Sequence, residues 1–534
     1  MRSKDAKGIM LTLKATSLDW AQAHAMKYGD TDVFPLPFEY EAIQFDWTNI
    51  KEYLQSQDVL TWTVRQHRTL LAPKAKYGFR VVTQLDPLDF IVFAAAVKEI
   101  AADLEASRIL TSKHIIYSYR YAPTKEGRLF DPTIGFGKFQ SVCKTVLERH
   151  PEFTHIASTD ISDFYSRIYH HRLENALYSA TDKGNHVKAI MNLLSGWNGT
   201  ETFGIPVGSA PARLLAETTI SDIDEALLAN DVKYVRFNDD FRIFAKSHSE
   251  AYRQLAFLAD ILFKNHGLNL QQQKTTVLQR ELFEHRYLSS PEDRELSSLQ
   301  NSFRDLLGSL GISDPYQTIE YGNLSDEAKE VIDSLNLFEL FQKEIESGEE
   351  PDLPVIRFVL RRLGQLGDPS VMEMVLEHLD SLHPAFPDII RYLSSLRGLD
   401  SCKRSEIGTA ILDLLNDSIL SELDYHRLWA LELFSRNTDW NNESRFFQLL
   451  SSLSDQPSRR KIILAMGRAG QRHWFKSRWR SLFEESPWPR RALLAGASCM
   501  PPDARKHWYK SVESRLDPLE KAIMRWCKQH PFVT

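Results

Sequence analysis

The chain has 534 residues, of which 43% are hydrophobic and 25% are charged. These proportions are typical of a globular protein and exclude a fibrous or disordered chain, and the length is enough for two or more domains with separate cores. A net charge of −6 excludes a chain that is basic over its whole surface, so any nucleic-acid site must be local.

The four cysteines stand far apart, at Cys143, Cys402, Cys499 and Cys527. Their spacing fits neither a disulfide framework nor a zinc site, and it favours a reducing, cytoplasmic environment. The amino terminus has no apolar core of signal-peptide length, and no stretch is apolar enough to span a membrane. We therefore expect a cytoplasmic protein that makes no membrane contact.

The first 131 residues predict a mixture of helices and short strands. Apolar residues recur at helical spacing over residues 87–109, and residues 77–82 predict a strand. Residues 115–131 predict a β-hairpin, because Pro and Gly provide a turn near its middle. Its cations could steady a triphosphate or simply face solvent: Arg120, Lys125 and Arg128.

A first candidate metal ligand follows the strand predicted over residues 153–159. Asp160 ends this strand, and a helix is predicted over residues 169–178. A carboxylate at the end of a strand is well placed to hold a metal ion rigidly. The alternative is an aspartate that caps the following helix.

A glycine-flanked proline follows, in Gly204-Ile205-Pro206-Val207-Gly208, before an apolar helix. Glycines at such a bend let a flat substrate approach the backbone closely. The alternative is an ordinary entry from a loop into a helix.

Two adjacent carboxylates interrupt the apolar run over residues 234–244. Asp239 and Asp240 stand at the predicted turn of a β-hairpin, where only a cation would relieve their repulsion. Mg²⁺ commonly takes one or two carboxylates together with substrate phosphates. A solvent-facing surface turn is the alternative. Further on, residues 267–275 predict another strand-like piece with Lys274 near its end.

The carboxyl-terminal half changes character. Residues 301–350 hold 12 acidic and 3 basic side chains and predict an acidic connector. Residues 351–534 predict short helices broken by Gly, Pro and Asp every 35–45 residues or so, which indicates HEAT-like repeats or an ordinary helical bundle. Residues 451–534 hold 17 basic and 7 acidic side chains and five tryptophans, a composition that suits single-stranded nucleic acid or a tryptophan core with solvated arginines.

The order of these motifs resembles that of reverse transcriptases: Asp160, the 204–208 loop, the Asp239–Asp240 turn and then Lys274. Phe237-Asn238-Asp239-Asp240 is similar to the family's Tyr-x-Asp-Asp box, with Phe in place of Tyr. The resemblance implies α+β reverse-transcriptase fingers and palm over residues 1–300, and Asp160, Asp239 and Asp240 as catalytic metal ligands. It also implies that Tyr165 excludes a ribose 2′-hydroxyl, so that dNTPs are the substrates, and that Lys274 is the palm lysine.

The sequence departs from the usual reverse-transcriptase pattern in two respects, and these indicate a particular group within that family. Val207 stands where the family usually has Gln, and an all-α HEAT-like domain over residues 351–534 stands where a thumb is expected. In both respects the chain resembles the abortive-infection (Abi) phage-defence reverse transcriptases, including a prophage-encoded member. That resemblance implies template-independent, protein-primed DNA synthesis through a tyrosine, a single-stranded DNA product attached covalently to the protein, and a bacterial homo-oligomer, a trimer or a hexamer.

The three candidate carboxylates predict catalysis by divalent metal ions. Two Mg²⁺ ions, with Mn²⁺ as the alternative, would be bridged by Asp160 and Asp239 on either side of the transferred phosphate. Asp240 would be a weaker ligand or an electrostatic support. Arg120, Lys125 or Arg128 would balance the triphosphate charge.

Two rival functions remain open. One is a retron- or intron-type reverse transcriptase that copies a bound RNA. The other is a non-catalytic scaffold in which the helical repeats bind protein and the palm is inert. The order of three carboxylates argues against the scaffold.

Overall fold

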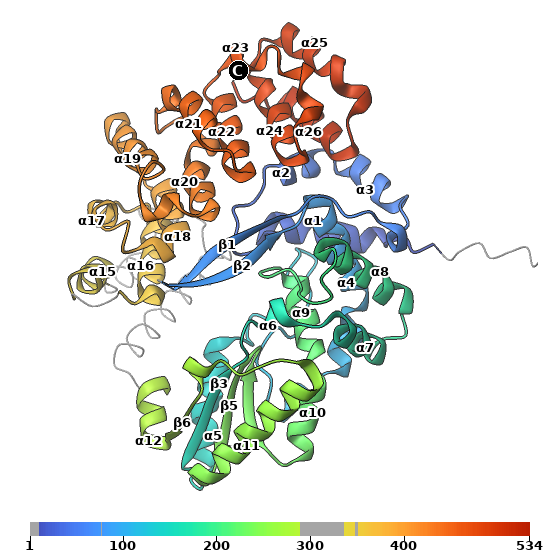
Figure 1. Cartoon of the computed structure of the whole chain (residues 1–534), viewed down its shortest axis with the longest axis vertical. Helices are drawn as coiled ribbons and strands as arrows, with labels where there is room; N and C mark the ends of the chain where they lie inside the picture. Colours follow the sequence, from blue (N-terminus) through green and yellow to red (C-terminus); the bar gives the residue numbers. More distant parts are fainter. Residues whose placement is uncertain (1–9, 76, 289–335, 348–350, 534) are drawn as a thin grey trace, which may run out of the picture. The chain divides into compact units, whose positions relative to one another are not determined.

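A computed structural model describes residues 10–75, 77–288, 336–347 and 351–533 (Figure 1). The chain divides into two compact units. The first consists of residues 1–40, 47–69 and 82–294, and the second of residues 41–46, 70–81 and 295–534. Two short amino-terminal segments therefore belong to the second unit. Most of the predicted acidic connector, 301–350, lies outside the described residues.

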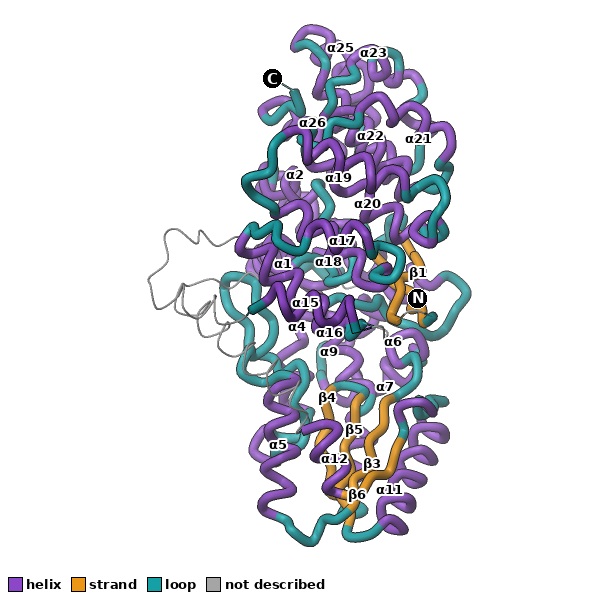
Figure 2. Tube along the Cα trace, turned by 90° about the vertical axis from the view of Figure 1, so that its left-hand side faces the viewer, coloured by secondary structure: helices purple, strands orange, loops and turns teal. Residues whose placement is uncertain are grey.

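The core of the first unit is a four-stranded antiparallel sheet with the strand order β4-β5-β3-β6 (Figure 2). Apolar side chains on one face of this sheet, among them Ile156, Val235 and Phe244, pack with Phe139 and Leu147 of a helix into one buried cluster. The strands are β3 (His155–Asp160), β4 (Lys233–Phe237), β5 (Asp240–Ala245) and β6 (Thr276–Gln279), and the helix is α5 (Phe136–Arg149).

Several helices of the first unit pack against α4 (Pro87–Ser107), which is buried along most of its length. Asp86 caps α4 by accepting a hydrogen bond from Leu88 N at 3.1 Å, and Pro87 occupies its first turn, as proline prefers. The predicted helix over residues 87–109 is thus confirmed. The other helices are α1 (Ala15–Tyr28), α3 (Trp47–Gln55), α6 (Phe164–Arg167), α7 (His170–Ala180), α8 (Gly184–Asn198), α9 (Ala210–Thr219), α10 (Ser221–Ala229), α11 (His248–Ile261) and α12 (Arg280–Phe283).

The hairpin predicted over residues 115–131 is reduced to one antiparallel bridge, between Tyr121 and Phe130. Its first residues pair elsewhere, because Ile116 forms a parallel bridge with Arg236 of β4. Tyr119 then turns the chain with a left-handed φ of 46°. A complete hairpin forms instead between β1 (Arg68–Ala75) and β2 (Gly78–Gln84), which contains most of the predicted strand 77–82.

The second unit is a succession of helices. Six of them contact one another in sequence order, and their first residues follow at intervals of 31 to 38 residues: α16 (Leu353–Leu366), α18 (Phe386–Ser395), α20 (Asp424–Arg436), α22 (Gln456–Arg468), α24 (Pro487–Gly496) and α26 (Pro518–Gln529). Shorter or outlying helices lie between them in sequence: α17 (Met372–Glu377), α19 (Ser401–Asp413), α21 (Phe446–Ser452), α23 (Arg472–Phe475) and α25 (Pro502–Val512). Two further helices are α2 (Glu39–Phe45) and α15 (Leu337–Glu346).

At four of the five steps along this series, an ion pair connects one helix to a residue at, or just before, the start of the next helix. The pairs are Arg361–Asp388 at 2.9 Å, Arg427–Asp455 at 3.1 Å, Arg459–Glu485 at 2.5 Å and Arg490–Glu520 at 2.5 Å. The predicted order of a mixed α/β region followed by a helical region is confirmed, and the HEAT-like character of the helices stays a prediction. Among the described helices, none is both long and apolar enough to cross a bilayer.

Candidate active site

The three predicted carboxylates come together at one edge of the sheet. β3 ends at Asp160, and its partner β5 begins at Asp240, so that the two residues face each other across the strand pair. Asn238 and Asp239 form the turn from β4 into β5, and Asn238 adopts a left-handed φ of 55°, which asparagine tolerates. The turn is tied to β3, because Ile161 N donates to Asp239 O at 3.1 Å. The predicted strand-turn-strand is confirmed.

Asp160 is buried, and Asp239 lies half-buried beside it. Burial raises the pKa of Asp239 to about 8, and the neighbouring Asp160 carboxylate raises it further in the same direction. Lys274 Nζ donates a hydrogen bond to Asp160 Oδ2. The backbone of the same segment is also tied to Asp160, because Gln271 N donates to Asp160 O at 2.7 Å. Burial lowers the pKa of Lys274, but its hydrogen bond to Asp160 outweighs this and leaves the pKa above the ordinary value. Lys274 thus reaches the site from the 3₁₀ turn that replaces its predicted strand.

Asp240 is paired within its own strand. Arg242 Nη1 lies 2.9 Å from Asp240 Oδ1. The guanidinium of Arg242 lies 5.4 Å from the ring centre of Phe139 and 5.2 Å from that of Tyr287, so aromatic faces hold it in place. Asp240 therefore has its charge balanced, whereas Asp239 has no ion-pair partner in the described part of the chain.

The donor set suits a divalent ion only in part. Within the described residues no group of three or more His, Cys, Asp or Glu side chains is arranged to hold a metal. Asp160 and Asp239 do fit one, because two carboxylates in mutual contact gain from a cation, and Mg²⁺ needs one or two carboxylates when phosphates complete its shell. In the structure Lys274 pairs with Asp160 and Arg242 pairs with Asp240.

Tyr165 lies beside the aspartate turn, on α6. Its Oη is 3.5 Å from Asn238 Oδ1, and its backbone carbonyl accepts a hydrogen bond from Ile205 N at 3.0 Å. Burial raises the pKa of Tyr165, so its hydroxyl stays protonated. The structure thus brings together Tyr165, the 204–208 loop and the turn, which lie far apart in sequence.

One side of the loop over residues 204–208 is packed against residues 31–32 of the same chain. A Cβ at Gly208 would lie 2.4 Å from Thr31 Oγ1 and 2.8 Å from Asp32 Oδ1, and the φ of Gly208 is +96°. The absence of a side chain at Gly208 therefore makes room for residues 31–32. The expected close approach of a flat substrate is not what this glycine provides.

The predicted cationic hairpin does not reach the carboxylates. Arg120 is buried, its Nη1 lies 2.9 Å from Glu105 Oε1, and its Nη2 donates to Ile109 O at 2.7 Å. Its guanidinium is already committed, which contradicts a role as a free triphosphate clamp. Lys125 is exposed and Arg128 half-buried, and neither contacts Asp160, Asp239 or Asp240. For these two the clamp stays a prediction.

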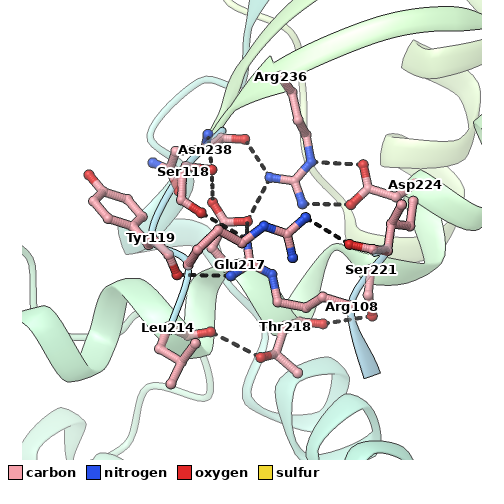
Figure 3. Close-up of polar contacts among 12 residues, drawn as sticks. Arg108, Ser118, Tyr119, Leu214, Glu217, Thr218, Ser221, Asp224, Arg236 and Asn238 are labelled. Carbon is pink, nitrogen blue, oxygen red and sulfur yellow. Dashed lines mark hydrogen bonds and ion pairs between the residues drawn. The ribbon is translucent and has the colours of Figure 1, made fainter. Parts of the chain in front are cut away.

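A buried network of ion pairs and hydrogen bonds supports the turn at Asn238 and Asp239 (Figure 3). The sequence patterns did not predict this network. Arg236 of β4 is fully buried, and its guanidinium pairs with Asp224 at 2.5 Å and with Glu217 at 2.9 Å. The same guanidinium donates to Asn238 O at 3.1 Å. The only signal in the sequence was an arginine within an otherwise apolar strand.

The network continues from Asn238 to α4. Asn238 N donates to Ser118 Oγ at 2.8 Å, and Ser118 Oγ donates to Glu217 Oε1 at 2.5 Å. Arg108 lies 2.6 Å from Glu217 Oε2 and donates to Ser118 O at 2.9 Å. Two arginines and two carboxylates balance their charges, as burial requires. Both backbone groups of Asn238 are therefore held, and with them the position of Asp239.

A second missed cation lies beside Tyr165. Arg213 of α9 lies 5.3 Å above the ring of Tyr119 and 2.5 Å from Asp32 Oδ2. Burial lowers the pKa of Arg213, but Asp32 outweighs this and raises it above the ordinary value. The hydroxyls of both Tyr119 and Tyr165 interact electrostatically with this guanidinium.

The comparisons with known proteins agree with this geometry. The family model described as reverse transcriptase (RNA-dependent DNA polymerase) matches residues 107–297, which include all four of Asp160, Asp239, Asp240 and Lys274. No curated protein matches the chain.

Two telomerase structures are similar to the chain at a low level. The structure from Candida albicans, in complex with the TWJ fragment of telomeric RNA, is 11% identical with a TM-score of 0.32, and the match covers 78% of this chain and 73% of that one. The one from Candida tropicalis, with the same RNA fragment, is 12% identical with a TM-score of 0.32, covering 66% and 64%. Nothing about this chain follows from similarity at that level. The family model thus identifies a reverse transcriptase domain within residues 107–297.

Proposed function

We propose that the chain polymerises deoxynucleotides with the help of divalent metal ions held by Asp160 and Asp239. The observation that carries this is the contact between the buried Asp160 carboxylate at the end of β3 and the half-buried Asp239 carboxylate of the β4–β5 turn, the second of which has no cationic partner in the described part of the chain. A bound Mg²⁺ or Mn²⁺ would supply Lewis-acid activation of the attacking hydroxyl. Asp240, already neutralised by Arg242, would shape the field around the pair.

In this proposal Lys274 and Tyr165 contact the incoming nucleotide. Lys274 would exchange its contact with Asp160 for a phosphate when the metals bind, because a carboxylate that ligates a metal attracts the ammonium less. The ring of Tyr165, fixed against Asn238 and Ile205, would face the sugar and exclude a 2′-hydroxyl. Of the cations near the turn, Arg213 is better placed than Arg120 for a triphosphate, since its partner Asp32 is exposed and exchangeable.

We further propose template-independent, protein-primed synthesis in a homo-oligomer that acts in bacterial phage defence. The support is the resemblance to abortive-infection reverse transcriptases and the apolar Val207 in the loop. A primer hydroxyl must reach solvent, and among the residues that the structure describes five tyrosines expose more than a third of their surface: Tyr28, Tyr77, Tyr169, Tyr178 and Tyr252. Tyr77, on the β1–β2 hairpin, is the most exposed at 83%. A tethered hydroxyl would have a high effective concentration at the metals.

The decisive experiment incubates the purified full chain with labelled dNTPs and Mg²⁺, with and without prior RNase treatment. We expect label to migrate with the protein on a denaturing gel, and to be released by nuclease and by protease. Replacing each of the five exposed tyrosines by Phe in turn would then locate the primer. Label that runs free of the protein before protease treatment would refute protein priming.

A templated, retron- or intron-type activity is the second candidate, and the family description as an RNA-dependent polymerase favours it. In that case the reaction would stop after RNase treatment and resume with an added RNA template and primer. A non-catalytic scaffold would incorporate nothing under either condition.

A further inference from the structure

One end of the helical unit carries a basic segment that differs from the rest of that unit. Residues 468–483 include five Lys or Arg and no Asp or Glu. Four of these cations lie on α23, on the 3₁₀ turn Arg478–Arg480, or between them: Arg472, Lys476, Arg478 and Arg480. None of the four has an acidic partner in the described part of the chain, whereas most neighbouring helices are joined by arginine–carboxylate pairs.

Helix α25 extends this segment into a surface. Trp508 Nε1 donates to Phe475 O at 3.1 Å and so fixes α25 beside α23, as both views show (Figures 1 and 2). Lys506 and Lys510 of α25 are exposed. Asp503 and Glu513 flank them, so the excess of positive charge comes mainly from the α23 side.

Arginines also lie over buried tryptophans elsewhere in the helical unit, but the two tryptophans of this segment are partly accessible. Trp488, Trp508 and Trp526 are buried in the core of the helical unit, but Trp474 is half-buried and Trp479 is 37% exposed. The guanidinium of Arg478 lies 4.4 Å from the ring centre of Trp474, and that of Arg480 lies 5.4 Å from Trp479. We call this set, with Lys476, Lys506 and Lys510, the α23–α25 surface.

We propose that the α23–α25 surface binds single-stranded nucleic acid. Unpaired cations attract the phosphates, and exposed Trp and Arg planes offer faces on which unpaired bases stack. A duplex hides its base faces, so it would use the cations but not Trp479. The choice of single-stranded DNA as ligand rests on the proposed function, because a polymerase of this kind leaves such a product attached to its own chain.

The test measures binding of a fluorescent oligo(dT) of about 20 nucleotides by anisotropy at several salt concentrations. The variant Lys476→Gln/Arg478→Gln/Arg480→Gln should bind at least about tenfold more weakly, and its log–log salt slope should fall by about 2, because each lost phosphate contact on a single strand contributes about 0.7. The control Lys144→Gln/Lys188→Gln/Arg253→Gln removes the same charge from exposed positions without tryptophans and should bind as wild type. Equal affinity of the two triple variants would overturn the proposal.

Stacking is tested separately. Trp479→Ala should weaken oligo(dT) binding about tenfold, and Trp479→Phe should restore most of it, since any aromatic face serves. Wild-type affinity in Trp479→Ala, or equal competition by duplex DNA, an acidic polypeptide or anionic vesicles, would refute single-strand recognition. The binding assay is repeated with Asp239→Asn, which should bind like wild type. A chain that binds but never incorporates dNTPs would therefore refute only the polymerase proposal.

Discussion

At the scale of single residues, Asp239 is the site carboxylate without a cationic partner among the described residues. It is half-buried beside Asp160 and, unlike Asp160 and Asp240, has no ion-pair partner among the described residues. Ionising Asp239 beside Asp160 without a cationic partner of its own costs folding free energy, and a bound cation would offset that cost. A carboxyl group whose ionisation is opposed in this way indicates a site for a cation.

We expect Asp239→Asn and Asp160→Asn to lower dNTP incorporation at least about 100-fold, because each removes a negatively charged metal ligand. The thermal midpoint of Asp239→Asn should not fall, since the amide relieves repulsion with Asp160. Incorporation and thermal unfolding are measured on the same preparations. Incorporation near the wild-type rate in either folded variant would contradict the polymerase proposal.

Tyr165→Ala should raise the use of ATP relative to dATP, because the ring beside Asn238 and Ile205 would no longer fill the space of a 2′-hydroxyl. Direct competition between dATP and ATP measures the ratio. Tyr165→Phe is the matched control: it keeps the ring, loses only the hydroxyl and should keep the discrimination. An unchanged ratio in Tyr165→Ala means that another residue excludes ribonucleotides.

Glu217→Gln tests the buried network. It leaves Arg108 and Arg236 facing each other without a shared carboxylate, and losing one partner of a buried ion pair typically costs about 3–5 kcal/mol. We expect a lower free energy of unfolding and, in the protein that remains folded, slower incorporation with a higher Mg²⁺ requirement. Asp260→Asn, which breaks the exposed Lys264–Asp260 pair, is the control and should change both quantities little. A stability loss with normal Mg²⁺ dependence would mean that the network does not position Asp239.

At the scale of elements, the turn over residues 123–128 is packed on α1 rather than free in solvent. A Cβ at Gly127 would lie 2.5 Å from His24 N, a backbone atom of α1 that cannot move aside easily. His24 Nδ1 lies 2.7 Å from Gly127 O, and burial lowers the pKa of His24 to about 4, so the neutral ring donates this hydrogen bond. The cationic hairpin is thus anchored, which limits how Lys125 could reach a substrate.

Gly127→Ala should therefore lower the free energy of unfolding by several kcal/mol, from both the clash and the φ of +94°. Gly199→Ala separates the two causes, because Gly199 has a φ of +64° with nothing within 4 Å of the added Cβ, and should cost only about 1 kcal/mol. Denaturant unfolding of both variants gives the comparison. Equal losses would show that α1 yields to the added methyl group.

At the scale of the whole molecule, the two units are interleaved in sequence. Residues 41–46 and 70–81 belong to the helical unit although they are surrounded in sequence by the first unit. Asp46 pairs with Arg525 at 2.6 Å, and the ring of Phe45 lies 5.4 Å from that of His530. A cut near residue 300 therefore removes the partners of two segments that lie far upstream.

Deleting residues 351–534 should consequently leave an insoluble or inactive protein rather than an independent polymerase. Solubility, thermal unfolding and dNTP incorporation of residues 1–350 are compared with those of the full chain. Arg525→Ala is the milder companion, and it should lower the thermal midpoint slightly without loss of activity. Full activity of the truncated chain would refute a structural dependence on the helical unit.

The sequence by itself determined the features that depend on neighbouring residues. The strand-turn-strand around Asp239, the end of β3 at Asp160 and the length of α4 follow from local hydrophobic pattern, turn residues and capping, and the structure confirms them. The three carboxylates could be proposed as one site only because their order resembled a known family.

Tertiary structure alone decided which distant groups meet. The pairing of β3 with β5 sets Asp160 opposite Asp240, and the contact of Ser118 with Asn238 spans 120 positions. Arg120 forms an ion pair with Glu105. Arg236 and Glu217, which belong to no recognisable sequence motif, pair with each other and support the turn. The physical reason is that burial and charge compensation depend on the packing of elements remote in sequence, which a local pattern of residue types does not contain.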